Sequence, residues 1–67
     1  MTIIYNDENV KLPNDFMTLA DLAEWKKIPK QGSAIAVNDK LVKREEWSVT
    51  KLKDFDRVTV ITAAFGG

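Results

Sequence analysis

The chain has 67 residues, and its ten basic and ten acidic side chains leave no formal net charge at pH 7. This length is enough for one domain, and the balanced charge gives no overall field that would attract nucleic acid or an anionic membrane. The sequence contains neither cysteine nor histidine, which excludes disulfides, thiolate metal sites, a cysteine nucleophile and the commonest acid–base group.

These exclusions argue against an enzyme, and we expect no catalytic residue and no metal site. No apolar run approaches the roughly 20 residues that a bilayer-spanning helix needs, and the N-terminus lacks a signal-peptide pattern. We therefore expect one cytoplasmic domain over residues 1–67. Its small core should depend on a few large side chains, namely Tyr5, Phe16, Trp25, Trp47 and Phe55.

The chain opens with a predicted hairpin. Residues 2–6 alternate as a strand does, with Ile3 and Ile4 on opposite faces. Residues 6–9 are typical of a turn, and residues 10–12 alternate again.

A helix is predicted over residues 18–27. Thr18 and Asp21 have the spacing of a capping box, and Pro29 prevents the helix from extending much further. Its apolar face comprises Leu19, Leu22 and Ala23, with Ile28 or Trp25 closing the end.

A second hairpin follows. Residues 34–37 form a short apolar strand, Asn38-Asp39 supplies the bend, and residues 41–42 return. We interpret Trp47 as a lid on the core. The alternative is that Trp47 and Arg44 contact a partner.

The last predicted strand, at residues 57–61, is the clearest in the chain because it is β-branched and alternating. The elements therefore run strand, strand, helix, strand, strand, turn, strand. This order predicts an α+β protein of the β-grasp class. Its mixed sheet of four to five strands should pack on one main helix, with the first and last strands parallel at the centre.

Beyond the last strand, residues 63–67 should form a flexible tail that ends in Gly66-Gly67. Glycine lacks a Cβ, so this end could pass through a channel too narrow for other residues. An α-carboxyl group titrates near 3.5, so a terminal carboxylate here should be ionised at neutral pH. The alternative is that the two glycines are a frayed or truncated end.

In its opening, middle and end, the sequence resembles the ThiS family, the small ubiquitin-like sulfur carriers of thiamine biosynthesis. The resemblance involves the strand and Asn turn at residues 3–7, the hairpin region at 36–47, and Gly66-Gly67, and it spans essentially the whole chain. Arg44 followed three positions later by Trp47 is the more specific feature, because other ubiquitin-like proteins share the double glycine.

Two positions depart from the family pattern. Family members often have Asp-Gly-Asp before the last strand, where this chain has Asp54-Phe55-Asp56. We expect this turn to be built without a residue that readily takes a positive φ. Phe65 is bulkier than the small residue often found before the two glycines, and it should alter how the tail lies in a partner's groove.

The resemblance implies that partner proteins perform the chemistry. A ThiF-like adenylyltransferase would use ATP to adenylate the Gly67 carboxylate, and sulfur from a cysteine desulfurase and sulfurtransferase system would displace AMP. The resulting thiocarboxylate would donate sulfur to thiazole synthase (ThiG). Gly66 would give the tail clearance, and the partner's channel would read Ala63, Ala64 and Phe65. The chain would bind no cofactor and be a monomer when free.

The outward face of the predicted sheet carries three apolar residues, Ile4, Ala36 and Ile61. Apolar residues gathered on a solvent face are typical of a protein-binding surface. We hypothesise that these three form a docking patch for the activating enzyme.

Three other functions fit parts of the sequence. The small subunit of molybdopterin synthase performs the same terminal chemistry for the molybdenum cofactor, but it lacks the Arg and Trp feature and is usually longer. A ubiquitin-like modifier would link Gly67 to lysines of other proteins. A non-conjugating β-grasp interaction domain would need neither terminal glycine.

Overall fold

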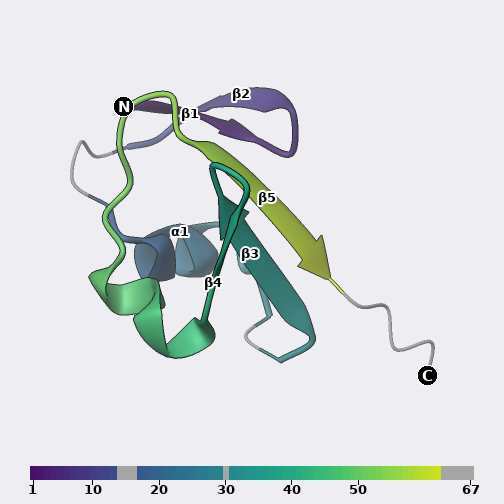
Figure 1. Ribbon diagram of the computed structural model, residues 1–67. Helices are drawn as coiled ribbons and strands as arrows, with labels where there is room; N and C mark the ends of the chain where they lie inside the picture. The colour runs from purple at the N-terminus through teal and green to yellow at the C-terminus, as the bar shows by residue number, and fades with distance from the viewer. Residues whose placement is uncertain (14–16, 30, 63–67) are drawn as a thin grey trace.

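The computed structural model describes residues 1–13, 17–29 and 31–62. These residues form five strands, one α-helix and one short 3-10 helix (Figure 1). The elements are β1 (Thr2–Tyr5), β2 (Glu8–Lys11), α1 (Leu19–Trp25), β3 (Ser33–Val37), β4 (Lys40–Val42), η1 (Arg44–Val49) and β5 (Arg57–Thr62).

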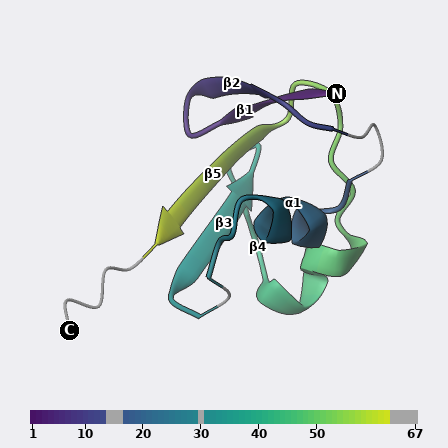
Figure 2. The ribbon, with the colours of Figure 1, turned by 180° about the vertical axis from the view of Figure 1, so that it is seen from behind.

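The strands form one mixed sheet in the order β2-β1-β5-β3-β4, so β5 lies at its centre. β5 runs parallel to β1 and antiparallel to β3, which confirms the predicted β-grasp arrangement. Figure 2 shows α1 and η1 together beside the sheet, and in both ribbon views the end of β5 lies far from the N-terminus.

Both hairpins turn on an Asn-Asp pair with left-handed backbone. The φ angles are 46° and 69° at Asn6 and Asp7, and 51° and 69° at Asn38 and Asp39. Two successive positive φ angles are typical of the type I′ turn, whose twist matches that of the flanking strands. The N-terminal turn is therefore tighter than the predicted 6–9, and β2 begins at Glu8.

The start of α1 follows the prediction. Thr18 is the N-cap: its N–H donates to Asp21 Oδ2 at 3.0 Å, and the Asp21 N–H donates to Thr18 Oγ1 at 3.1 Å. This reciprocal pair is the predicted capping box, which satisfies two backbone donors that have no partner within the helix.

The end of α1 comes earlier than the predicted residue 27, because Lys27 takes a φ of 56°. The Lys27 N–H donates to the Glu24 carbonyl at 3.1 Å, and the Ile28 N–H donates to the Ala23 carbonyl at 2.7 Å. These two bonds form a Schellman motif with lysine at the position where glycine is usual. Ile28 is buried and closes the end of the helix.

The core lies between α1 and the sheet. It comprises Ile3, Leu12, Met17, Leu19, Leu22, Ala23, Ile28, Ile35, Trp47, Leu52 and Val58. Trp47 is only 3% exposed and donates its indole N–H to the Val42 carbonyl at 3.1 Å, which confirms its role as a lid. Arg44 stays exposed, so its contact with a partner stays a prediction.

Two of the five large side chains expected in the core are not there. Trp25 is 44% exposed because it lies two residues, or about 200° around the helix, from the buried Ala23. Phe55 is 67% exposed because it occupies a bend. Tyr5 is half-buried against the core, and Phe16 lies outside the described residues.

The expectation for the bend before β5 is wrong. Phe55 itself takes a positive φ of 66°, so the turn keeps its left-handed residue without glycine. Tertiary hydrogen bonds hold this conformation, since the Phe55 N–H donates to the Thr2 carbonyl at 2.6 Å and the Asp56 N–H to the Lys53 carbonyl at 3.0 Å. The left-handed conformation costs a non-glycine residue roughly 1–2 kcal/mol.

Candidate functional site

The central strand of the sheet leads to the predicted reactive end of the chain. β5 ends at Thr62, five residues before Gly67. The tail residues Ala63, Ala64, Phe65, Gly66 and Gly67 lie outside the described residues, so their roles stay predictions. The described part of the site is therefore the outward face of the sheet and the contacts that hold the end of β5.

The three residues of the predicted docking patch all lie on the outward face of the sheet. The core-facing residues Ile3, Ile35 and Val58 alternate along their strands with outward-facing ones. Ile61 is 65% exposed, whereas Ile4 and Ala36 are half-buried.

Sequence reasoning missed a fourth apolar residue on this face. Leu41 pairs with Ala36 in the β3–β4 hairpin and is 71% exposed. Residues paired across a two-residue turn face the same side, so the Asn38-Asp39 bend already placed Leu41 on the side of Ala36. Ala34 pairs with Ile61, so the apolar surface runs from β5 across β3 to β4.

Ile4 lies apart from Ile61 on the same face. In the register of β1 and β5, Ile4 pairs with Arg57, which is four residues before Ile61. At about 3.3 Å per residue, this places Ile4 roughly 13 Å along β5 from Ile61.

The charged side chains on the outward face are all positive. Arg57 is its cation on β5, beside Ile4, and Lys11 is its cation on β2. Its residues on the five described strands are Thr2, Ile4, Asn9, Lys11, Ala34, Ala36, Leu41, Arg57, Thr59 and Ile61. None of these ten has a carboxylate, although the whole chain is neutral. The face therefore combines apolar residues with two cations and no carboxylate.

Near its end, β5 is held by the side chain of Asn6. The Val60 N–H donates to Asn6 Oδ1 at 2.8 Å, and Asn6 Nδ2 donates to the Val60 carbonyl at 3.3 Å. The Asn6 backbone N–H also donates to the Val58 carbonyl at 2.9 Å. One residue at the first turn thus makes three hydrogen bonds to the last strand.

The start of β5 is held by a buried carboxylate. Asp56 is 9% exposed, and its Oδ2 accepts from the Lys53 N–H at 2.7 Å while its Oδ1 accepts from Asn38 Nδ2 at 3.0 Å. Asn38 Oδ1 in turn accepts from the Arg57 N–H at 3.0 Å. This network fixes the bend relative to the second hairpin.

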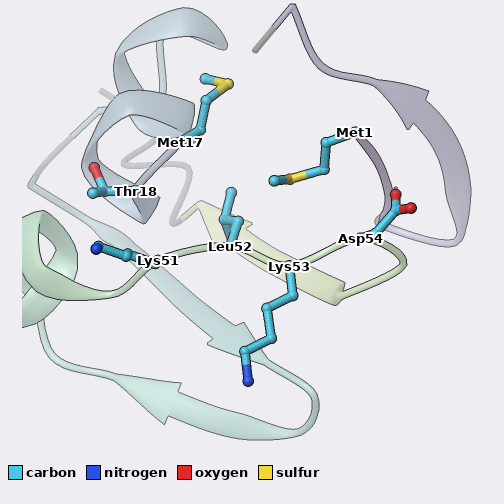
Figure 3. Close-up of a pocket in the computed structure, with 7 residues that line it drawn as sticks. All are labelled: Met1, Met17, Thr18, Lys51, Leu52, Lys53 and Asp54. Atoms are coloured by element: carbon cyan, nitrogen blue, oxygen red, sulfur yellow. The ribbon is translucent and has the colours of Figure 1, made fainter. Parts of the chain in front are cut away.

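Beside the N-terminus there is an open hollow of about 930 Å³. Met1, Met17 and Leu52 give it an apolar wall, and Figure 3 shows the Met1 and Leu52 side chains pointing toward one another while Lys53 extends away. Its other lining residues are Thr18, Lys51, Lys53 and Asp54. We assign this hollow no function.

Burial raises the pKa of the Tyr5 phenol above its ordinary value of 10.0. Lys26 Nζ lies 4.8 Å from the centre of the Tyr5 ring and 5.7 Å from that of Trp25, both within cation–π range. A phenol with a raised pKa stays protonated at neutral pH, so Tyr5 is not suited to act as a base there.

Across residues 1–13, 17–29 and 31–62, no group of three acidic, histidine or cysteine side chains is arranged to hold a metal ion. Within the same ranges, no helix has the length and apolarity needed to cross a bilayer.

Comparison with known proteins gives one consistent family. The family model described as the ThiS family matches residues 3–67. The sulfur carrier protein ThiS of Escherichia coli (strain K12) is 28% identical over 67 residues, and the match covers both chains in full.

Two solved structures share the fold. One is a crystal structure of the thiamine biosynthesis protein ThiS from Geobacter metallireducens, with a TM-score of 0.85, 20% identity and full coverage of both chains. The other is a solution structure of a thiamine biosynthesis protein from the same organism, also with a TM-score of 0.85 and 20% identity, and here the match covers all of this chain and 88% of the other. With the family model matching nearly every residue, the chain belongs to the ThiS family of sulfur carriers in thiamine biosynthesis.

Proposed function

We propose that this chain carries sulfur as a thiocarboxylate at Gly67. A Gly67 carboxylate oxygen attacks the α-phosphate of ATP in the active site of a ThiF-like adenylyltransferase, and pyrophosphate leaves. A protein persulfide, loaded from cysteine through a desulfurase and sulfurtransferase, then attacks the acyl carbon with its outer sulfur. The carbon–oxygen bond to AMP breaks as the carbon–sulfur bond forms. A thiolate of the partner then attacks the inner sulfur of this acyl disulfide, so that the partner keeps a disulfide and the Gly67 thiocarboxylate leaves.

The observation that carries this proposal is the family match, which extends through Gly67 itself. The composition supports it, because a chain without cysteine cannot carry sulfur on a side chain and the terminal carbon is the available position. The position of β5 supports it too, because the strand that leads to Gly67 is the central strand of the sheet.

We infer that the chain is a substrate and not a catalyst. Its sequence has no phosphate-binding loop and no histidine, so ATP binding and proton transfer fall to the partner. The chain then needs no cofactor of its own. We place this chemistry in the cytoplasm, where ATP and cysteine are available, and we place thiazole synthase as the acceptor of the sulfur.

The docking patch is proposed to bind the activating partner. Its predicted members Ile4, Ala36 and Ile61, joined by Ala34 and Leu41, supply the apolar contact, and Arg57 supplies a cation beside Ile4. A complementary partner surface would be apolar and would place a carboxylate opposite Arg57. The tail residues 63–67 would then reach the partner's active site, with Gly66 giving clearance.

Two variants test the two parts of this proposal separately. Ile61→Asp should raise the KM of the activating enzyme for the carrier, because it places a charge in the apolar contact. Removal of Gly66 and Gly67 should abolish loading and leave binding largely intact. Val49→Asp is the matched control, since Val49 is 75% exposed but lies on η1, away from the outward face of the sheet. Equal effects of Ile61→Asp and Val49→Asp would contradict the docking patch, and loading without the glycines would contradict the reaction.

A further inference from the structure

We propose that Asn6 is a positioning residue for the transfer reaction: its side chain keeps the end of β5 paired, so that the tail leaves the sheet from a fixed point. This inference rests on the proposed function for its consequence, but its structural part can be measured on the free chain. The Asn6 side chain makes two hydrogen bonds to the backbone of Val60.

The Asn6 side chain continues the pairing with β5 beyond the point where the β1 backbone turns away. β1 pairs with β5 only at Ile4 with Arg57 and Tyr5 with Val58, because the chain then turns away with a φ of 46° at Asn6. A carboxamide offers the same donor and acceptor as a peptide group. Asn6 uses both on Val60, at 2.8 Å and 3.3 Å, and so stands in for the next residue of the strand.

The end of β5 depends on this contact more than its middle does. On the β3 side, pairing extends to Thr62 opposite Ser33, but on the β1 side the paired strand residues stop at Val58. Strand ends with a single neighbour open at low free-energy cost. The Asn6 carboxamide gives Val60 a partner on the second side, three residues before Ala63.

A β5 end that opens would change how the tail is presented. Each released residue of β5 would have to be ordered again when the tail enters the partner's active site, at an entropic cost. Fewer docked complexes would then have Gly67 in place for adenylation. Docking through Ile61 would also weaken, because Ile61 lies in the strand end that opens, whereas Ala36 and Leu41 on β3 and β4 would keep their places. The expected signature is a lower kcat accompanied by a smaller rise in KM.

The experiment compares Asn6→Gly with Asn38→Gly. Glycine accepts the positive φ of both sites, so each variant keeps its turn and loses only the carboxamide. Asn38 is the matched control because it has the same position in its turn, but it bonds to Arg57 at the start of β5. Adenylation and loading are measured well below the unfolding temperature of either variant, with hydrogen exchange of the free chains alongside.

For Asn6→Gly we expect kcat to fall about tenfold, the effect of roughly one additional residue to be ordered. Faster exchange of the Ile61 amide in the free chain should accompany this fall, although Ile61 pairs with Ala34 and not with Asn6. Asn38→Gly should retain the wild-type kcat even where it lowers stability.

An unchanged kcat and Ile61 exchange in Asn6→Gly would overturn the proposal, as would an equal fall in kcat for Asn38→Gly. If the wild-type chain were never loaded, the proposed function would fail instead. The exchange of Ile61 would still decide whether Asn6 holds the strand end.

Discussion

Asn6 and Asn38 occupy the same position in the two hairpin turns, and each accepts a hydrogen bond from a backbone N–H of the central strand. Asn6 accepts from Val60 at 2.8 Å and Asn38 from Arg57 at 3.0 Å. Both need a left-handed backbone for their turns, which asparagine tolerates better than most residues. The two hairpins therefore hold β5 near its end and at its start.

Of the two carboxylates at the bend before β5, Asp56 should contribute more to the free energy of unfolding than Asp54. Asp56→Ala leaves the Lys53 N–H and Asn38 Nδ2 without their acceptor in a buried place, and we expect it to lower the free energy of unfolding by about 2–3 kcal/mol. Asp54→Ala is the control, because the exposed Asp54 accepts one bond from the Thr2 N–H and should lose about 1 kcal/mol or less. Urea denaturation measures both, and equal losses would contradict the network.

Phe55→Gly should stabilise the protein by about 0.5–1 kcal/mol, because relief of the left-handed phenylalanine outweighs the greater freedom of glycine in the unfolded chain. Phe55 is largely exposed, so little packing is lost. Lys53→Gly, at a nearby site without a positive φ, should destabilise by roughly 0.5–1 kcal/mol. In thermal unfolding, the midpoint should rise for Phe55→Gly and fall for Lys53→Gly. A lower midpoint for Phe55→Gly would show that the turn is not strained.

The two tryptophans should respond differently to the same substitution. Trp47→Phe removes the donor to the Val42 carbonyl in a buried site, and we expect a loss of about 1–2 kcal/mol. Trp25→Phe changes a half-exposed side chain and should stay within about 0.5 kcal/mol. Chemical denaturation of the two variants checks this order, and the reverse order would place the lid at Trp25.

The raised pKa of Tyr5 predicts that the free energy of unfolding falls at alkaline pH. Its pKa in the folded state is raised above 10.0 by burial, so the unfolded chain loses the phenolic proton first as the pH rises. The Tyr5 contribution is therefore complete below about pH 10 and is lost as the pH rises through the folded-state pKa. Tyr5→Phe should flatten the decline in unfolding free energy above about pH 10, measured by urea titration at several pH values. An unchanged decline would mean that Tyr5 does not titrate differently on folding.

Local patterns predicted most of the fold correctly. The Thr18 capping box, the Asn38-Asp39 turn and the β-branched strand, predicted at residues 57–61 and found at Arg57–Thr62, each depend on residues close together in the sequence. The early end of α1 could not be predicted in this way, because Lys27 takes a backbone conformation that is usual for glycine. The left-handed Phe55 depends on the distant Thr2 carbonyl.

The candidate site was only partly visible in the sequence. Ile4, Ala36 and Ile61 lie on the predicted face, and Leu41 could have been added from the hairpin register. The contact of Asn6 with Val60 joins residues 54 positions apart, so no local pattern contains it.

The proposed reaction takes place at the terminal carboxylate of Gly67. Intact mass spectrometry after incubation with ATP, a ThiF-like enzyme and a cysteine-derived sulfur source can detect its product. We predict a mass gain equal to the replacement of one oxygen by one sulfur, located at Gly67 by fragmentation and absent without ATP. An unchanged mass under conditions that load a known carrier, or sulfur located at any other residue, would contradict the proposed reaction.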